Sequence, residues 1–231
     1  MLKIDQLNQF YGESHTLWDL NLHVPEGEVT VLMGRNGVGK TTLLQCIMGL
    51  LKVRSGEMTY QGQSLAGVDA EKRANLGIGY VPQGRQIFPL LTVEENLLIG
   101  LPARRDKLRS IPPFIFELFP VLKQMLNRRG GDLSGGQQQQ LAIGRALVLD
   151  PKLLILDEPT EGIQPNIVHE IGDIIRKLNQ DIGLTVLLVE QKLPFARRVG
   201  DRFCLLDRGR QVAMGGMREL DEGLIHKYLT V

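Results

Sequence analysis

The sequence predicts an α/β fold built on a parallel sheet, and three observations carry this prediction. Three short apolar runs, Val29–Met33, Lys152–Leu156 and Thr185–Val189, are typical of strands buried on both faces of a sheet. Between the second and third runs, Asn166–Leu178 carries apolar residues at helical spacing, which completes a β-α-β unit. Clustered glycines mark loops where the backbone turns sharply or approaches a ligand.

Two further regions of the chain follow different patterns. Apolar and polar residues alternate within residues 2–7, 20–24 and 57–61, so we expect antiparallel strands there. Residues 86–150 are expected to form a mostly helical subdomain, with Pro112, Pro113 and Pro120 as breakers. After Asp201, residues 203–206 and 211–214 flank Asp207-Arg208-Gly209 as a hairpin, and a short helix follows. We interpret residues 1–231 as one domain.

Composition excludes several classes of protein. The chain is 43% hydrophobic and 23% charged, which is close to the average for soluble globular proteins. Lys and Arg number 27 and Asp and Glu number 26, and the resulting net charge of +1 argues against nucleic acid as a partner. No run of 18 apolar residues indicates a membrane span, and the N-terminus lacks a signal-peptide core. Cys46 and Cys204 are far apart in sequence, so we expect free thiols in a reducing compartment.

A glycine-rich loop follows the first apolar run and precedes a helical segment, Thr41–Leu50. Residues 34–41, GRNGVGKT, fit the pattern G-x-x-x-x-G-K-[ST]. Backbone N–H groups of such a loop surround phosphate oxygens, and the following helix adds the positive end of its dipole. Lys40 supplies a charge to the β- and γ-phosphates, and Thr41 supplies a hydroxyl to Mg²⁺. The loop therefore predicts nucleotide binding.

Two carboxylates, Asp157 and Glu158, end the second apolar run, where α/β sheets bind ligands. Asp157 fits the acid on the Mg²⁺ side of P-loop NTPases. Glu158 is the candidate that orients and deprotonates the attacking water. The alternative is a solvated acidic pair at a strand end, and the phosphate loop in the same chain disfavours it.

A second loop, LSGGQ at residues 133–137, precedes another helical segment. Ser134 is suited to cap that helix and to leave N–H groups facing an anion. Two loops in different lobes of one chain cannot easily enclose the same phosphate. We therefore infer that two subunits each complete the site of the other.

In this order, GRNGVGKTT, LSGGQ and LLILDEPT resemble the ATP-binding subunits of ABC transporters, over the whole chain. The resemblance implies a P-loop NTPase fold of the ABC ATPase type, with a RecA-like core, an antiparallel β subdomain and a helical subdomain. It implies ATP and Mg²⁺ as ligands and hydrolysis of ATP to ADP and phosphate. The implied partners are membrane permease subunits, a related ATPase or a second copy of the chain, and an extracytoplasmic solute-binding protein. The implied location is the cytoplasmic face of the cell membrane.

The resemblance also assigns roles to single residues. Tyr11 matches the aromatic residue that stacks on adenine, and Gln83 matches the glutamine that contacts Mg²⁺ and the attacking water. Asp157 and Glu158 match the metal acid and the catalytic base, so the implied metal set is Thr41, Gln83 and Asp157. The other nucleotide-binding positions belong to the two loops: Arg35, Asn36, Gly37, Val38, Gly39, Lys40, Thr41 and Thr42, and Ser134, Gly135, Gly136 and Gln137. The second set would meet the γ-phosphate of ATP bound to the opposite subunit.

Two positions depart from the family pattern. Gln164 stands where an Asp is usual, and Gln191 stands where a histidine is expected after the third apolar run. A glutamine amide can donate a hydrogen bond to a γ-phosphate, but it does not titrate near neutral pH. We predict that hydrolysis survives with Gln191 and is driven mainly by Glu158.

These departures resemble the branched-chain amino acid uptake branch of the family. Within that branch, YGESH, GRNGVGKTTLLQCIMGL and GYVPQGRQIFPLLTVEENL are most similar to urea-uptake ATPase subunits. The resemblance implies an importer motor that couples ATP-driven dimer closure to uptake of urea, with branched-chain amino acids or short amides as alternatives. Residues 86–91 are expected to receive a coupling helix of the permease, the alternative being core of the helical lobe. A DNA- or ribosome-acting ABC protein is disfavoured because the chain has one set of motifs and no heptad array, and Glu158 argues against a non-hydrolysing switch.

Overall fold

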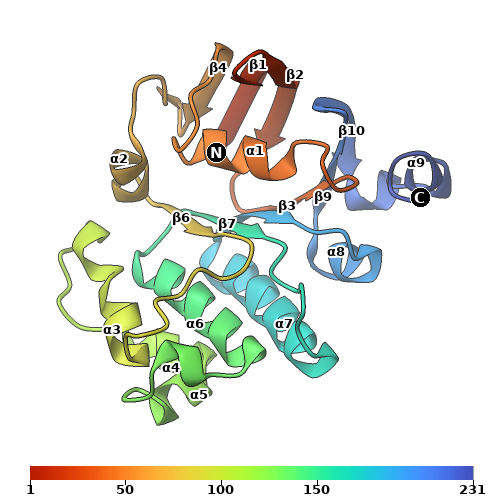
Figure 1. The fold of residues 1–231 in the computed structure, drawn as a ribbon. Helices are drawn as coiled ribbons and strands as arrows, with labels where there is room; N and C mark the ends of the chain where they lie inside the picture. Colours follow the sequence, from red (N-terminus) through yellow and green to blue (C-terminus); the bar gives the residue numbers. More distant parts are fainter. Residues whose placement is uncertain (231) are drawn as a thin grey trace.

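A six-stranded sheet forms the centre of residues 1–230, which the computed structural model describes (Figure 1). Its strand order is β10-β9-β3-β8-β7-β6. The strands are β3 (Val29–Met33), β6 (Ile78–Val81), β7 (Leu153–Asp157), β8 (Thr185–Val189), β9 (Arg202–Asp207) and β10 (Arg210–Gly216). All pairs except β9–β10 are parallel, and β3, β7 and β8 are buried along their whole length. The parallel sheet expected from the three apolar runs is therefore confirmed.

A four-stranded antiparallel sheet and one helix cover the first face of this central sheet. The antiparallel sheet has the order β2-β1-β4-β5, from β1 (Leu2–Tyr11), β2 (Ser14–Val24), β4 (Ser55–Tyr60) and β5 (Gln63–Ser64). Helix α1 (Lys40–Ile47) lies between the two sheets (Figure 1). One core cluster joins all three, and Leu32 and Ile155 are among its members from the central strands.

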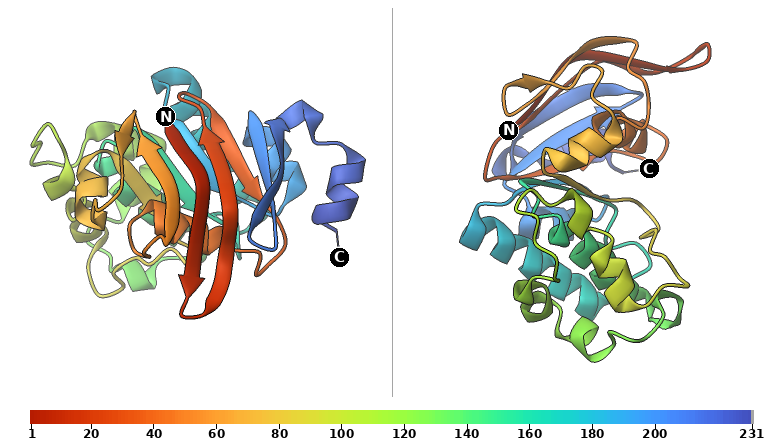
Figure 2. Two further views of the ribbon diagram at one scale, coloured as in Figure 1. Left: turned by 90° about the horizontal axis from the view of Figure 1, so that it is seen from above. Right: turned by 90° about the vertical axis from the view of Figure 1, so that its left-hand side faces the viewer.

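Helices cover the second face. This layer contains α3 (Val93–Leu98), α4 (Pro113–Leu118), α5 (Pro120–Gln124), α6 (Gly135–Val148), α7 (Pro165–Ile182) and α8 (Leu193–Val199). Val31 and Leu154 point into this second cluster, whereas their chain neighbours Leu32 and Ile155 point into the first. Because strand side chains alternate between faces, a strand with a core on each face must be apolar at every position. Figure 2 shows the helical layer apart from the two sheets.

The prolines of the helical region act differently from the prediction. Pro113 and Pro120 are the first residues of α4 and α5, where a missing N–H costs nothing, so they start helices instead of breaking them. Residues 86–92 contain no helix, and a 3-10 turn (Leu101–Ala103) is the only helical element between α3 and α4. Residues 86–150 therefore contain less helix than the sequence analysis predicts.

The remaining elements complete the ends of the chain and its connections. Arg208 and Gly209 have positive φ angles of 46° and 76°, which suits the two-residue turn between antiparallel β9 and β10. Short 3-10 turns occupy Gly130–Asp132 and Met217–Glu219, and α2 (Ala70–Asn75) and α9 (Glu222–Tyr228) are short helices. Cys46 and Cys204 are buried and unpaired, and burial raises their thiol pKa values to about 11 and about 12. Within residues 1–230, no helix is long and apolar enough to cross a membrane.

Candidate functional site

The phosphate loop connects the end of β3 to the start of α1, as the sequence predicts. Gly34, Gly37 and Gly39 all have positive φ angles, which favour glycine. A Cβ at Gly34 would lie 2.4 Å from the Leu206 carbonyl oxygen, so only glycine fits there. Gly39 precedes α1 and no side chain caps that helix. The first N–H groups of α1 are therefore free of side-chain acceptors at the place where the dipole favours an anion.

Lys40 is held in place by its own loop. Its side chain is only 5% exposed, and Nζ donates to the carbonyl oxygens of Gly34 (2.8 Å) and Arg35 (2.9 Å). Nζ also lies 3.8 Å from Glu158 Oε1. Burial lowers the Lys40 pKa, whereas the carboxylates of Glu158, Asp157 and Glu190 oppose that change. A positive charge is thus fixed beside the two predicted acids.

Asp157 is the last residue of β7 and is 2% exposed. Its Oδ2 accepts a hydrogen bond from Thr41 Oγ1 at 3.3 Å, whereas its buried Oδ1 has no partner. Burial first, and then the neighbouring Glu158, raise the pKa of Asp157 to about 6. An unpaired carboxylate oxygen next to a hydroxyl is a fitting pair of ligands for a hard cation such as Mg²⁺.

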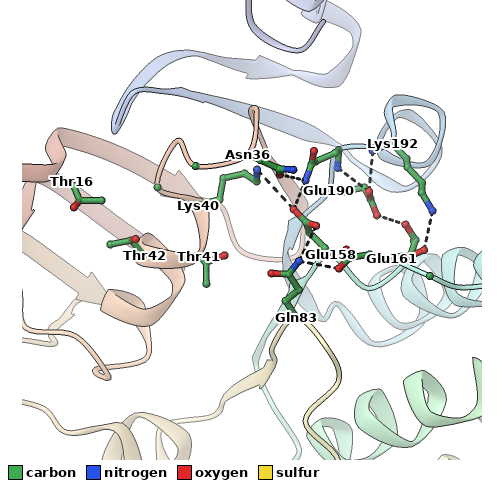
Figure 3. Close-up of a pocket in the computed structure, with 15 residues that line it drawn as sticks. Thr16, Asn36, Lys40, Thr41, Thr42, Gln83, Glu158, Glu161, Glu190 and Lys192 are labelled. Atoms are coloured by element: carbon green, nitrogen blue, oxygen red, sulfur yellow. Dashed lines mark hydrogen bonds and ion pairs between the residues drawn. The ribbon is translucent and has the colours of Figure 1, made fainter. Parts of the chain in front are cut away.

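Glu158 occupies a strained position at the centre of the cavity. Its φ of 48° lies in the left-handed region, which is uncommon for a residue with a side chain, and its N–H donates to the Val189 carbonyl at 2.9 Å. Oε1 accepts from Gln191 Nε2 at 2.5 Å, and Oε2 accepts from Gln83 Nε2 at 3.4 Å (Figure 3). Such strain costs about 1–3 kcal/mol and persists where the surroundings fix the residue. Both amides therefore face the same carboxylate.

Gln191 also joins this group to the phosphate loop, because its Nε2 donates to Asn36 Oδ1 at 2.7 Å. Gln83 Nε2 makes a second bond to Glu161 Oε2 at 2.9 Å. These residues line a cavity of about 610 Å³ at the carboxyl ends of β3, β7 and β8 (Figure 3). Sequence reasoning missed six further lining residues: Thr16, Thr160, Glu161, Gly162, Glu190 and Lys192. Five of them lie beside Glu158 or Gln191 in the sequence, whereas nothing in the sequence points to Thr16.

The LSGGQ segment lies at a different place. Ser134 caps α6, with its hydroxyl accepting from the Gln137 N–H at 3.4 Å, while Gln137 Oε1 accepts from the Ser134 N–H at 2.9 Å. This helix end lines a second cavity of about 390 Å³, which shares only Gly162 with the first. Helix α6 covers the second face of the central sheet and α1 covers the first (Figure 1). One chain therefore does not bring the two loops together.

The comparisons with known proteins decide the family. Residues 17–161 match the family described as "ABC transporter".

The chain belongs to the ABC transporter ATP-binding family.

Two relatives are both named as ATP-binding proteins of branched-chain amino acid transport. One is the "High-affinity branched-chain amino acid transport ATP-binding protein BraG" of Pseudomonas aeruginosa, 42% identical, covering 92% of this chain and 91% of the relative. The other is the "Probable branched-chain amino acid transport ATP-binding protein LivF" of Archaeoglobus fulgidus, 39% identical, covering 96% and 94%. A solved dimer of the ATP-binding cassette MJ0796 bound to ADP and Pi has a TM-score of 0.84 and 29% identity, covering 95% of this chain and all of the other. The chain is thus an ABC ATPase that binds ATP, and its fold is the one the sequence predicts.

The predicted LSGGQ residues line the second cavity, and three other predicted nucleotide-binding residues lie outside the lining of the first, as does the predicted metal acid Asp157. Tyr11 ends β1 and is 48% exposed, with its hydroxyl 3.5 Å from Thr42 Oγ1 on α1. The Val38 side chain belongs to the first core cluster. The Arg35 guanidinium donates to the Thr230 carbonyl near the C-terminus. For Val38 and Arg35, contact with phosphate would have to come from the backbone.

The segment predicted to meet the permease is divided between surface and core. Phe88 and Leu90 are 45% and 79% exposed, whereas Ile87 packs against the second core cluster. Arg145 of α6 donates to the Gln86 carbonyl at 2.8 Å, and its guanidinium carbon lies 5.2 Å from the Phe88 ring centroid. Arg85 Nη1 donates to Gln138 Oε1 of α6 at 3.2 Å. The segment is therefore anchored to the helix that begins with LSGGQ.

Proposed function

We propose that this chain is the ATP-hydrolysing motor of an ABC importer whose transported solute is urea. The observation that carries the motor part is the arrangement of Lys40, Gln191 and Gln83 around the Glu158 carboxylate, in one cavity beside the phosphate loop. A single chain thus presents a charge for phosphates, a candidate base and two amides to the same space.

The proposed mechanism follows from this geometry. Glu158 accepts the proton of the water that attacks the γ-phosphorus, while Lys40 and the N–H groups of α1 offset charge on the phosphate oxygens. Asp157, Thr41 and Gln83 are the residues that would hold Mg²⁺, which supplies Lewis-acid stabilisation of those oxygens when bound. Gln191 Nε2 donates to Glu158 Oε1 at 2.5 Å, so Gln191 orients the carboxylate.

Gln191 gives this ATPase a switch residue without a titrating side chain. Its amide can donate one hydrogen to Glu158 and, by exchanging its bond to Asn36 Oδ1, the other to a γ-phosphate oxygen, and its charge stays zero at every working pH. We infer that hydrolysis depends mainly on Glu158 and that Gln191 sets the direction of its carboxylate.

The working unit in this proposal has two ATPase subunits on a membrane permease, with an extracytoplasmic solute-binding protein. The separation of the two cavities supports the pairing of two ATPase subunits, since the LSGGQ helix end of one chain is free to face the phosphate loop of another. The exposed side chains of Phe88 and Leu90 support the contact with a permease, because they offer a permease helix an apolar surface in the segment that follows Gln83. This arrangement would place the chain at the cytoplasmic face of the membrane.

Urea and branched-chain amino acids are the two candidate solutes, and different observations favour them. The motifs around residues 11–15, 34–50 and 79–97 resemble urea-uptake subunits. The curated relatives BraG and LivF, at 42% and 39% identity, carry names of branched-chain amino acid transport. In this proposal the ATPase does not touch the solute, so its site residues do not select between them.

Uptake in cells separates the two solutes and tests the motor at the same time. Cells that lack the chain would be complemented with the wild type, with Glu158→Gln, or with Asp181→Asn, an exposed acid outside the cavity, as a matched control. We expect loss of labelled urea uptake alone, with rescue by the wild type and by Asp181→Asn but not by Glu158→Gln. Loss of labelled leucine uptake instead would replace urea with branched-chain amino acids, and rescue by Glu158→Gln would contradict the motor.

A further inference from the structure

We propose that Glu190 is a positioning residue for ATP hydrolysis, because it fixes Gln191 and Glu158 relative to each other. Glu190 lies directly after β8, and neither the family match nor the motifs single it out. This inference rests on the proposed role of Gln191 beside Glu158.

The Glu190 carboxylate joins two separate loops. Its side chain is 3% exposed, and Oε1 accepts from the backbone N–H groups of Gln191 (2.8 Å) and Lys192 (2.9 Å). Oε2 accepts from the Thr160 hydroxyl at 2.7 Å, and Thr160 is fully buried. One carboxylate therefore holds both the loop that carries Gln191 and the loop that begins at Glu158 (Figure 3).

Two further hydrogen bonds connect the loops that meet at Glu190. The Glu190 N–H donates to the Leu32 carbonyl at 3.2 Å, just before the phosphate loop. Lys192 Nζ donates to the Thr160 carbonyl at 2.9 Å. The ends of β3, β7 and β8 are thus connected through residues 190–192.

A buried carboxylate needs a reason to be retained, because burying a charge without partners is costly. Here three donors within 2.9 Å compensate for the lost water, and hydrogen bonds to a charged acceptor are stronger than neutral ones. An apolar side chain at position 190 would leave the Gln191 and Lys192 N–H groups without this acceptor. The backbone at Gln191 would then no longer be held in place, and the hydrogen bond from the Gln191 side-chain amide to Glu158 would be lost.

Replacing Glu190 with glutamine distinguishes its role in holding the two loops from any role of its negative charge. In Glu190→Gln the amide oxygen can still accept from both backbone N–H groups, and the amide nitrogen can donate to Thr160 Oγ1, because a hydroxyl is also an acceptor. In Glu190→Leu all three bonds are lost with little change in volume. If Glu190 positions the loops, glutamine should preserve function and leucine should not.

Steady-state ATP hydrolysis by the purified chain tests this role. For Glu190→Leu we expect kcat to fall about tenfold, because displacing a group at the reacting centre by about 1 Å can cost as much as about 100-fold in rate. We expect the KM for ATP to stay within about twofold, because the phosphate loop is intact. Glu190→Gln should retain the wild-type kcat. Asn179→Leu is the structural control, since Asn179 is also buried and joins Gly27 and Leu184 through its amide, but far from the cavity.

A double-mutant cycle with Gln191→Ala identifies the path of the effect. If Glu190 acts through Gln191, Glu190→Leu causes no further loss of kcat in a Gln191→Ala background. If the fold-losses of kcat from Glu190→Leu and Gln191→Ala multiply in the double variant, the positioning role is overturned. A Glu190→Gln variant as slow as Glu190→Leu would overturn it too. An unchanged kcat in Gln191→Ala would overturn it as well, while the motor itself is tested separately by Glu158→Gln. Should Glu190→Leu not fold, Thr160→Val removes one of the three bonds with little change in shape and carries the same cycle.

Discussion

The two glycine-rich helix ends of this molecule have opposite physical characters. At the start of α1, five charged residues line the cavity: Lys40, Glu158, Glu161, Glu190 and Lys192. At the start of α6, Glu170 is the only charged residue that lines the cavity. Helix α1 has no side-chain cap, whereas α6 has a complete capping box from Ser134 and Gln137.

This difference shows how the work of binding ATP can be divided. Glu158, which lines the α1 cavity, has a strained backbone, and the buried Asp157 behind Thr41 has one oxygen without a partner, so this region has groups that a ligand would satisfy. The α6 end has a complete capping box and a single charged residue in its cavity lining. It is suited to close over a phosphate that another surface already holds.

The largest effect is expected at Glu158. Glu158→Gln removes the base but keeps the shape, so we expect kcat to fall by roughly 10²–10⁴-fold while ATP still binds. Phosphate release and equilibrium binding of a fluorescent ATP analogue measure the two separately. Wild-type hydrolysis in this variant, combined with loss of hydrolysis in Gln191→Ala, would reverse the roles of the two residues.

A charge at the α6 end tests whether the second cavity belongs to the site of another chain. In a Glu158→Gln background we expect ATP to produce a stable dimer, and Ser134→Arg to weaken it by about 1–3 kcal/mol, because the larger side chain occupies the space that the phosphate of the other subunit would fill. Size-exclusion chromatography with light scattering reports the dimer. ATP binding to the monomer should be unchanged, and a dimer that persists with Ser134→Arg would contradict the two-subunit site.

Asp157→Asn should stabilise the nucleotide-free protein in a pH-dependent manner. Because the folded protein raises the Asp157 pKa to about 6, ionising this group costs stability as the pH rises through that value. The variant avoids this cost, so its free energy of unfolding should exceed that of the wild type by about 2–3 kcal/mol at pH 8 and by little near pH 4.5.

Urea denaturation at several pH values measures this difference. The same variant should lose Mg²⁺-dependent hydrolysis, since one of the residues fitted to the ion is neutral. A stability difference that does not change with pH would show that Asp157 is not the group responsible. The α6 end has no acid without partners, so a matched Glu170→Gln variant should show no such dependence.

The sequence predicts best those strands and site residues whose structural or chemical role requires a recognisable run of neighbouring residues. The strands β3, β7 and β8 were predictable because a core on both faces requires apolar residues throughout. The positions of Lys40, Asp157 and Glu158 were predictable because each directly follows such a strand or its glycine loop.

What could not be predicted depends on contacts between loops distant in sequence. Glu190 and Thr160 are 30 positions apart, and no local pattern indicates that they share a hydrogen bond. The contact of Arg85 with Gln138 likewise spans 53 positions. Because Arg85 precedes the segment predicted to contact a permease, its substitution would disturb α6 as well as that segment. Phe88→Ala is therefore the better test of coupling, and we expect it to reduce transport more than basal hydrolysis.

The smallest of the effects argued in full concerns Gln191. Its amide orients the Glu158 carboxylate but carries no charge, so Gln191→Ala should lower kcat by about tenfold rather than abolish it. Gln191→His should keep a donor at this position and add a titrating group, so its kcat should show an additional change between about pH 5 and 8 that the wild-type profile lacks. A pH profile of kcat for the three proteins measures both effects. A profile of the same shape in Gln191→His and in the wild type would show that residue 191 does not act on the proton transfer.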